Sequence, residues 1–317
     1  MSVASLQPPP AVLPGDGVSI VAPASSPEPA TLEAAIAGLT AAGFCPKTYR
    51  DLCSPVGYLS GADDDRAAEL NEAFTDPDTT VVLAARGGYG VGRILDRIDF
   101  GLLSARPKVV CGYSDITALH AAVQRRCGLV SLHGPNLVDG WGDVSVDTLA
   151  ERQAIHALLT HATQPGRELI ADRSVAPQAL VGGAAEGRLV GGNLAVLVSL
   201  VGTPWEPDFD GAILAIEDVG ESAYRVDRLL NQLRTAGRLE RVAGVVTGYF
   251  TGGDSAEAPS IEEVLAEYLT PLGVPVLAKG PFGHEHPNLP LPMGAAVRLD
   301  ADAGSLVTRD PIVASRA

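Results

Sequence analysis

The segment Lys108-Val109-Val110-Cys111-Gly112-Tyr113-Ser114-Asp115-Ile116 joins a short apolar run to a stretch of helical spacing. The apolar run at its start predicts a buried strand. Leu119 and Val123 continue the helical spacing after this segment, and Gly128 is a natural position for the helix to end. Ser114 is therefore expected on a sharp turn between a strand and a helix, beside the free backbone N–H groups of the first helical turn.

Two interpretations of Ser114 follow from this position. At such a turn a serine hydroxyl is exposed, as in a nucleophile elbow, and the backbone N–H groups beside it can bind a developing oxyanion. A serine that only caps a helix, or forms a local turn, occupies the same kind of junction. The segment alone leaves both interpretations open.

Strands and helices alternate on both sides of this turn, from about residue 17 to residue 135. The predicted strands are short apolar runs at residues 17–22, 79–85, 108–111 and 129–132. The predicted helices cover residues 29–42, 63–74 and 117–127, and one more runs through Ile94, Leu95 and Ile98. This alternation predicts a doubly wound parallel sheet of the flavodoxin-like type.

The second half of the chain is expected to form a β-rich α/β domain. Its predicted strands are residues 185–190, 211–216, 242–250, 274–278, 295–299 and 305–308, and its predicted helices are 194–201, 224–236 and 261–269. A helix at 147–159 and a polar stretch separate the two halves. We therefore expect an N-terminal domain over residues 1–160, a linker over 161–180 and a C-terminal domain over 181–317.

The charge of the chain limits its partners. The 317 residues carry a formal net charge of −15. Because nucleic acids and anionic membranes are bound by basic surfaces, this charge argues against both. No apolar run has the length of a membrane span, and the first residues lack the basic and apolar regions of a signal peptide, so a cytoplasmic protein is expected.

Three loops leave the carboxyl ends of predicted strands, which is where open α/β sheets bind ligands. They are residues 86–92, 112–115 and 133–136. The first, Arg86-Gly87-Gly88-Tyr89-Gly90-Val91-Gly92, partly resembles a phosphate-binding loop, but its spacing is not G-x-G-x-x-G. Glycines also let a backbone N–H approach a reacting carbonyl, and we consider that use at least as probable, so no cofactor is predicted.

A serine nucleophile needs a base, and the chain has six histidines. His284 lies in a loop rich in glycine and proline, which would hold its imidazole in place. His133 ends a predicted strand at the same sheet edge and is a rival base. His120 lies within the predicted helix and is expected to point away from Ser114. His284 and His286 could share one face as a metal pair, but a third ligand in a matching context is missing, so no metal site is predicted.

The base in turn needs an orienting carboxylate. Glu217 ends an apolar strand, where carboxylates are rarely placed without a partner. The alternative is that Glu217 pairs with an arginine such as Arg225, or caps the following turn.

Taken together, these stretches resemble the LD-carboxypeptidase family of serine peptidases, which contains muramoyltetrapeptide carboxypeptidases and microcin C self-immunity peptidases. Each matching motif is weak alone, but they occur in order from about residue 17 to residue 300. The motifs are Ala85-Arg86-Gly-Gly-Tyr-Gly90, Gly112-Tyr-Ser-Asp115, Gly191-Gly-Asn-Leu194, Gly202-Thr-Pro204, Ile216-Glu-Asp218 with Tyr224-Arg-Val-Asp227, and Gly283-His284.

The resemblance implies a Ser–Glu–His triad in which Ser114 is the nucleophile, His284 the base and Glu217 the residue that orients the imidazole. It also implies a site between the two domains, commonly in a dimer. The implied oxyanion donors are backbone N–H groups, one at Asp115 and one at Gly87 or Gly88. The candidate substrate contacts are Arg86, Asn193, Trp141 and Arg225.

The resemblance implies a small peptide substrate, with cleavage of the L–D amide bond of a cytosolic muropeptide and release of D-alanine. The alternative activity is hydrolysis of an aminoacyl–nucleotide conjugate, which would need an aromatic surface for the base. Trp141, flanked by glycines in an expected loop, is the candidate for that surface. An α/β-hydrolase esterase and a nucleotide-binding module are further alternatives, although the segment after Ser114 lacks the second glycine of a G-x-S-x-G motif.

Overall fold

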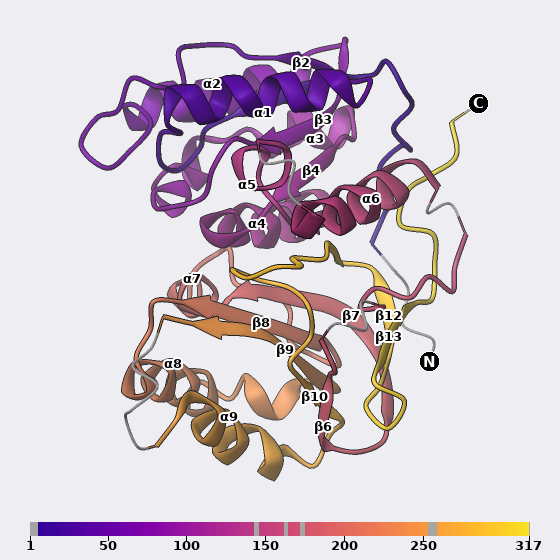
Figure 1. Ribbon diagram of the computed structural model, residues 1–317. Helices are drawn as coiled ribbons and strands as arrows, with labels where there is room; N and C mark the ends of the chain where they lie inside the picture. The colour runs from indigo at the N-terminus through magenta and orange to yellow at the C-terminus, as the bar shows by residue number, and fades with distance from the viewer. Residues whose placement is uncertain (1–5, 143–145, 162–163, 172–174, 253–258, 317) are drawn as a thin grey trace.

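Two β-sheets organise the chain, one above the other in Figure 1. The computed structural model describes residues 6–142, 146–161, 164–171, 175–252 and 259–316. Most of the first sheet comes from the N-terminal half, and the second sheet comes entirely from residues after 177. Each sheet is packed against helices, so the fold is mixed α/β, as predicted (Figure 1).

The first sheet contains β1 (Gly17–Val21), β2 (Cys45–Lys47), β3 (Thr79–Ala84), β4 (Val109–Gly112), β5 (Ser131–His133) and β11 (Leu291–Met293). Its strand order is β11-β5-β4-β3-β1-β2, and the first five strands of the chain run parallel. The order 2-1-3-4-5 within it is that of flavodoxin-like sheets. The predicted sheet type is therefore confirmed.

Helices cover the first sheet, which explains why β3 is buried along almost its whole length. They are α1 (Pro29–Ala41), α2 (Asp63–Thr75), α3 (Phe100–Ala105), α4 (Thr117–Cys127), α5 (Leu137–Trp141) and α6 (Val146–His161). Three acidic residues, Asp63, Asp64 and Asp65, occupy the first turn of α2, where the helix dipole favours negative charge.

One predicted helix of the first sheet is wrong. The segment through Ile94, Leu95 and Ile98 forms two short 3₁₀ turns, and α3 begins only at Phe100. The side chain of Asp99 accepts a hydrogen bond from the Gly101 amide, which starts the helix there.

Two strands of the first sheet were not predicted from the sequence. β2 and β11 have three residues each, and each contains a proline at its centre, Pro46 and Pro292. Such short strands carry no periodicity, and proline is typical of edge strands, where its missing N–H does no harm. Both lie at the edges of the first sheet.

The second sheet contains β6 (Gln178–Val181), β7 (Ala184–Asn193), β8 (Ile213–Val219), β9 (Gly244–Thr251), β10 (Val276–Ala278), β12 (Ala296–Asp300) and β13 (Ser305–Thr308). Its order is β13-β12-β7-β8-β9-β10-β6. The central strands β7 to β10 run parallel, and the flanking strands pair antiparallel. A β-rich C-terminal unit was predicted and is confirmed, whereas the half-exposed edge strand β6 was missed.

Three helices pack against the second sheet: α7 (Leu194–Ser199), α8 (Ala223–Thr235) and α9 (Ile261–Leu269). The buried face of α8 carries Val226, Leu230 and Leu233, at the helical spacing that the sequence predicted. These side chains join a core cluster with Ile216 of β8, so α8 supports the strand that carries Glu217.

The domain division expected at residues 161–180 stays a prediction. β11 belongs to the first sheet although it comes late in the chain, and Pro10 and Ala314 form a β-bridge. One core cluster also contains residues of both sheets, among them Leu132 and Leu189. The C-terminal part of the chain therefore contributes to both sheets.

The two sheets approach closely where α4 meets the end of β7. The Asn193 amide donates a hydrogen bond of 2.9 Å to Thr117 Oγ1. A Cβ atom added to Gly192 would lie 2.4 Å from the same oxygen, and Gly192 has a φ of +124°. Glycine is needed here both for its backbone conformation and for the close contact.

Within the described residues, no helix combines the length and the apolar composition that crossing a bilayer requires.

We predict that Gly192→Ala lowers the free energy of unfolding by about 3 kcal/mol, because it adds backbone strain and overpacking at one position. Gly202→Ala is the control, since Gly202 also has a positive φ, +80°, but an added Cβ would meet nothing within 4 Å. That variant should lose only about 1 kcal/mol. Denaturant unfolding of both variants measures the difference, and equal losses would show that the contact with Thr117 is not tight.

Candidate active site

Ser114 lies on the turn between β4 and α4, in a short 3₁₀ segment from Ser114 to Ile116. Its φ is +65°, a left-handed conformation that is uncommon for a residue with a side chain. Such strain is kept where function requires a particular direction of the side chain. The side chain is partly accessible, whereas its neighbours Asp115 and Ile116 are buried.

Hydrogen bonds from neighbouring elements hold the backbone of this turn in place. Gly112 O accepts hydrogen bonds from the Gly134 amide, at 3.1 Å, and from His120 Nε2, at 2.8 Å. The Tyr113 amide donates to Asn136 Oδ1 at 3.2 Å. The loop after β5 therefore supports the loop after β4, as expected for loops at one edge of a parallel sheet.

His120 does not point away, so that expectation was wrong. Its ring is fully buried between the Gly112 carbonyl and Ser131 Oγ, which lies 2.9 Å from Nδ1. Burial lowers the pKa of His120 to about 4, against the smaller opposite effect of the Gly112 hydrogen bond. His120 is thus a neutral support of the turn.

Glu217 and His284 form a short hydrogen bond. Glu217 is fully buried within β8, which continues to Val219 instead of ending at residue 216 as predicted, and its Oε2 lies 2.6 Å from His284 Nδ1. The side chain of His284 is 14% exposed. Burial lowers the pKa of His284, but the hydrogen bond and the charge of Glu217 outweigh it, so the pKa is raised above the ordinary 6.5. The alternative prediction, in which Glu217 pairs with Arg225, is wrong, because Arg225 pairs with Glu221 at 3.3 Å on the surface.

The loop that carries His284 runs from β10 in the second sheet to β11 in the first, and so passes between the two sheets (Figure 1). Gly283 has a φ of +111°, and a Cβ added there would lie 2.8 Å from Glu217 Oε2. Only glycine allows this close approach. The loop can therefore lie directly on Glu217 and bring His284 to it.

A second carboxylate, Glu151 of α6, fixes the far end of this loop. Glu151 Oε1 accepts a hydrogen bond of 2.7 Å from the Asn288 amide and lies 2.6 Å from His286 Nδ1. Asn288 Oδ1 in turn accepts a bond from the Gly283 amide at 3.0 Å. His284 and His286 therefore have different carboxylate partners. The sequence offered no sign of Glu151, which lies 135 residues before His286.

The turn of Ser114, the ring of His284 and the glycine loop meet at one place. The Tyr113 and His284 rings have centroids 4.7 Å apart. A Cβ added to Gly87 would lie 2.8 Å from Ser114 Cβ and 3.1 Å from Ser114 Oγ, so Gly87 lies directly against the serine. Gly88, with a φ of +115°, instead approaches the Ser25 side chain.

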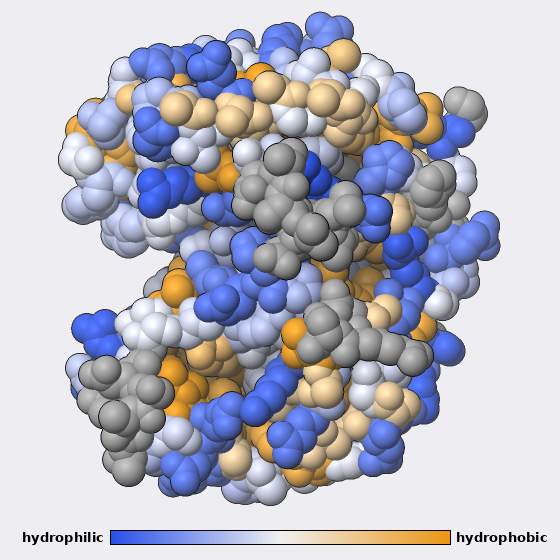
Figure 2. All heavy atoms as spheres, in the orientation of Figure 1, coloured by the Kyte–Doolittle hydropathy of each residue, from blue (hydrophilic) through white to orange (hydrophobic). Residues whose placement is uncertain are grey.

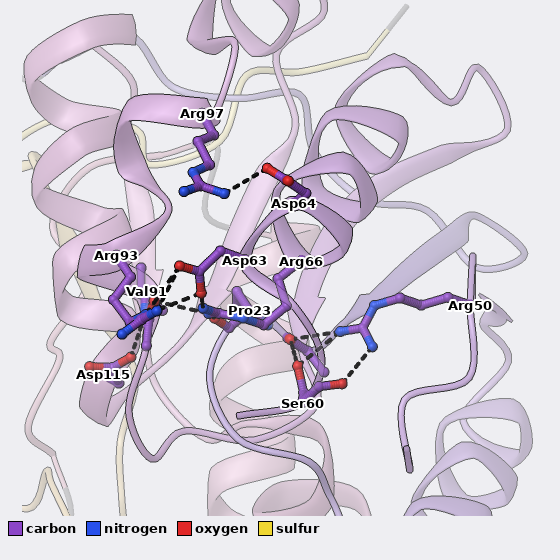
Figure 3. Close-up of polar contacts among 12 residues, drawn as sticks. Pro23, Arg50, Ser60, Asp63, Asp64, Arg66, Val91, Arg93, Arg97 and Asp115 are labelled. Carbon is purple, nitrogen blue, oxygen red and sulfur yellow. Dashed lines mark hydrogen bonds and ion pairs between the residues drawn. The ribbon is translucent and has the colours of Figure 1, made fainter. Parts of the chain in front are cut away.

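A buried polar network anchors the glycine loop (Figure 3). Asp115 Oδ2 accepts a hydrogen bond of 2.8 Å from the Val91 amide, which joins the loop to the turn of Ser114. Burial raises the pKa of Asp115 to about 6, against the amide hydrogen bonds that lower it. Arg66, fully buried, donates to Gly90 O at 2.9 Å and to Pro23 O, and pairs with Asp63 at 2.5 Å.

The four residues predicted to contact the substrate lie in different environments in the structure. Arg86 is exposed beside Gly87 and donates to Ser26 O, and Arg225 is exposed on α8. Asn193 is buried, where its side chain caps α7 and donates to Asp218 Oδ1 at 2.9 Å. Trp141 is 4% exposed in α5, with its ring 6.1 Å from that of Phe44. Trp141 is thus a core residue and not part of an open loop.

His133, the rival base, lies on the opposite side of Glu217 from His284. It is fully buried on β5, with Nε2 4.0 Å from Glu217 Oε1, whereas His284 contacts Oε2. His284, and not His133, therefore occupies the partly exposed position next to the turn of Ser114.

A cavity of about 680 Å³ lies elsewhere, between β9 and α9, and its lining includes Tyr249, Phe250, Ser260 and Lys279. Ser114, Glu217 and His284 do not line it. Chemistry selects the candidate site here: a strained serine, a partly exposed imidazole and a buried carboxylate are the groups of serine hydrolysis. Figure 2 shows a notch between the two lobes of the molecule.

Known proteins resemble the chain over nearly its whole length. Family models for the LD-carboxypeptidase N-terminal and C-terminal domains match residues 18–134 and 186–299. The probable murein peptide carboxypeptidase of Bacillus subtilis (strain 168) is 40% identical over 290 residues, which are 90% of this chain and 89% of that protein.

Solved structures give the same result. MccF in complex with glutamyl sulfamoyl guanosine superposes with a TM-score of 0.90 at 26% identity, over 97% of this chain and 99% of that one. The muramoyltetrapeptide carboxypeptidase from Oxalobacter formigenes superposes with a TM-score of 0.80 at 31% identity, over 93% of this chain and 99% of that one.

We predict that Arg66→Met lowers the free energy of unfolding by about 3 kcal/mol, because it leaves Asp63 and two backbone carbonyls without their buried donor. Arg97→Met is the matched control. Arg97 also pairs with an aspartate of α2, Asp64, but both side chains are exposed, so the loss should be close to zero. Denaturant unfolding measures both, and a loss for Arg66→Met as small as that of the control would contradict the anchoring role.

Proposed function

Because the chain belongs to the LD-carboxypeptidase family and is a serine peptidase, we propose that it hydrolyses the L–D amide bond of murein peptides and releases the terminal D-alanine. The observation that carries this proposal is the buried Glu217–His284 pair beside the strained turn of Ser114. A family relationship alone would give the fold without the chemistry, whereas this pair supplies the groups that the reaction needs.

In the proposed mechanism His284 is neutral before the reaction. Its Nδ1–H donates to Glu217, which leaves Nε2 as the acceptor for the proton of Ser114 Oγ. Ser114 Oγ then attacks the carbonyl carbon of the scissile amide. Glu217 stays ionised throughout and stabilises the imidazolium that forms.

Backbone N–H groups are proposed to bind the oxyanion of the tetrahedral intermediate. The Asp115 amide follows the nucleophile at the start of the helical segment, where N–H groups have no partner within the helix. The second donor comes from the glycine loop. The position of Gly87 directly against Ser114 supports that loop as its source, and Asp115 and Arg66 hold the loop there.

The collapse of the intermediate requires a proton on the leaving amine. His284 donates the proton that it took from Ser114, the C–N bond breaks, and D-alanine leaves. A water molecule then attacks the acyl-enzyme with His284 again as the base, and the shortened peptide is released with Ser114 restored.

Murein peptides are favoured as substrate by sequence identity. The relative named as a probable murein peptide carboxypeptidase is 40% identical over 290 residues, whereas the microcin C7 self-immunity protein MccF of Escherichia coli is 31% identical over 270 residues. The burial of Trp141 removes the aromatic surface expected for a nucleotide base.

Hydrolysis of an aminoacyl–nucleotide conjugate is the second candidate. It is favoured by the TM-score of 0.90 with MccF, which exceeds the 0.80 with the muramoyltetrapeptide carboxypeptidase. Both candidates use the same Ser114, Glu217 and His284, and they differ only in what the cleft must bind.

A cytoplasmic location and a homodimeric state are part of the proposal. Both rest on the family resemblance, and recycled muropeptides would meet the enzyme in the cytosol. Light scattering of the purified protein measures its mass, and cell fractionation measures its location. A monomeric mass would contradict the homodimeric state, and recovery in the membrane fraction would contradict the cytoplasmic location.

We predict that Ser114→Ala and His284→Ala each lower kcat about 10³-fold or more, and that the double variant is little worse, because triad members act as a unit. His286→Ala is the control, since His286 is a neighbour that pairs with Glu151 instead. It should keep most of the activity. A dead His286 variant beside an active His284 variant would reverse the assignment of the base.

The activity should fall as the pH drops through a value above 6.5. The base must be neutral to accept a proton, and the pKa of His284 is raised, so its neutral form is lost at a higher pH than for an ordinary histidine. The pH dependence of kcat/KM measures this limb. Asp115 titrates with a pKa of about 6 and could produce a limb of its own, so Asp115→Asn is the control, in which the limb should remain. A profile flat from pH 5 to 8 would exclude a histidine base.

The substrate is tested by giving the purified enzyme a murein tetrapeptide and an aminoacyl-sulfamoyl nucleoside and comparing kcat/KM. We expect at least tenfold preference for the tetrapeptide, with release of D-alanine. The reverse preference would make the conjugate hydrolase the better description. Ser114→Ala must abolish either activity for it to belong to this site.

A further inference from the structure

His133 is a buried imidazole whose polar atoms lack partners. Its side chain is fully buried on β5, opposite Gly112 of β4 in the sheet. Among the residues that the structure describes, neither of its ring nitrogens makes a hydrogen bond. Since buried polar groups in folded proteins are almost always hydrogen-bonded, an orphaned ring inside the core needs an explanation.

The second unsatisfied atom lies beside it. Glu217 Oε1 is also buried and has no hydrogen-bond partner within the described ranges, and it lies 4.0 Å from His133 Nε2. The other oxygen of the carboxylate, Oε2, already accepts the bond from His284. One donor and one acceptor, each without a partner, therefore face each other in the core.

The other groups around His133 cannot take the place of Glu217. The ring of His120 lies 6.0 Å away in an edge contact, and its nitrogens are already bonded to Gly112 O and Ser131 Oγ. The ring of Tyr113 lies 6.2 Å away, also edge-on. Glu217 is thus the only carboxylate recorded in contact with His133 in the described part of the chain.

His133 carries one N–H in this setting. Burial lowers its pKa well below the ordinary value, and the neighbouring His120 and His284 lower it further, so the ring is neutral. A neutral imidazole has one N–H donor and one acceptor nitrogen. A carboxylate oxygen beside Nε2 selects the tautomer with the proton on Nε2.

We infer that His133 is a positioning residue, which donates its Nε2–H to Glu217 Oε1 and holds the carboxylate in the plane that His284 needs. The inference rests on the triad proposed above. The 4.0 Å separation exceeds a hydrogen bond, so the inferred bond requires the two side chains to move closer together. Catalytic hydrogen bonds are often long without substrate and tighten in the complex.

This arrangement gives Glu217 two imidazole donors with different tasks. His284 exchanges protons with the substrate, whereas His133, on the buried side, never contacts it. Without the second donor, the carboxylate of Glu217 can rotate about its Cγ–Cδ bond. Its negative charge then interacts with His284 alone. The proton on His284 is then held more tightly, so its pKa rises.

The test compares His133→Phe with His133→Gln. Phenylalanine fills the same space without a donor, whereas the glutamine amide can donate from near the place of Nε2. We expect His133→Phe to lower kcat about 10-fold to 100-fold, the loss of one hydrogen bond to a charged group, with KM changed less than about twofold. The acid limb of kcat/KM should move to higher pH. His133→Gln should restore kcat to within about threefold and return the limb to its original place.

A purely structural role predicts a different result. Both variants would then lose stability and activity together, without movement of the limb, and that outcome would overturn the inference. Equal activity of His133→Phe and the unsubstituted enzyme would overturn it as well. If the unsubstituted enzyme hydrolyses neither substrate, it is the proposed function that fails.

A measurement on the unsubstituted protein tests the inference even if the variants do not fold. Nitrogen-15 NMR of histidine-labelled enzyme reports the tautomer of each ring, with the His133 signals identified by through-space contacts of its ring with the rings of Tyr113 and His120. We expect Nε2 to carry the proton between pH 5 and 9. A proton on Nδ1, or titration of His133 in this range, would overturn the inference without any activity assay.

Discussion

The buried carboxylate of Glu217 is the constraint on which the site depends. A charge buried within a strand is unfavourable unless a donor meets it inside the protein. The donor comes from the loop between β10 and β11, and this loop can lie on the carboxylate only because residue 283 is glycine. The same loop then continues into β11 and joins the first sheet. One interaction therefore orients the imidazole and helps to connect the two sheets.

Buried side chains make hydrogen bonds to the backbone of each loop of the site. Arg66 and Asp115 hold the glycine loop, His120 holds the serine turn, and Glu151 holds the end of the histidine loop. Each of these side chains is largely removed from water, where hydrogen bonds to charged groups are strong and hard to replace. These contacts fix the positions of loops that would otherwise hold a site less precisely than helices and strands do.

Identity and shape rank the relatives differently, and this has a physical basis. The fold depends on the core and on the two sheets, which MccF and the muramoyltetrapeptide carboxypeptidase share with this chain. The substrate depends on the side chains that border the cleft. Similarity of fold therefore does not identify the molecule that is cleaved, which depends on the side chains of the site.

The local features of the sequence predicted much of the fold and the candidate residues of the site. The run of strand, turn and helix around Ser114 depends on residues next to one another, and so does the buried strand that contains Glu217. The periodicity of α8 predicted its buried face for the same reason. Short strands with a central proline, such as β11, escaped because three residues carry no period.

What the sequence alone determined was therefore most of the longer helices and strands, the sharp turn of Ser114 and the presence of a carboxylate that needed a partner. Which histidine meets Glu217, and from which side, was decided by the tertiary structure, since His284 and His133 lie far from it along the chain on separate elements. The same holds for His120, whose helix places it over β5, and for Trp141, which packs against Phe44 instead of lining a loop. These contacts join residues that are distant in sequence, and local patterns of hydrophobicity contain no information on how two sheets pack against each other.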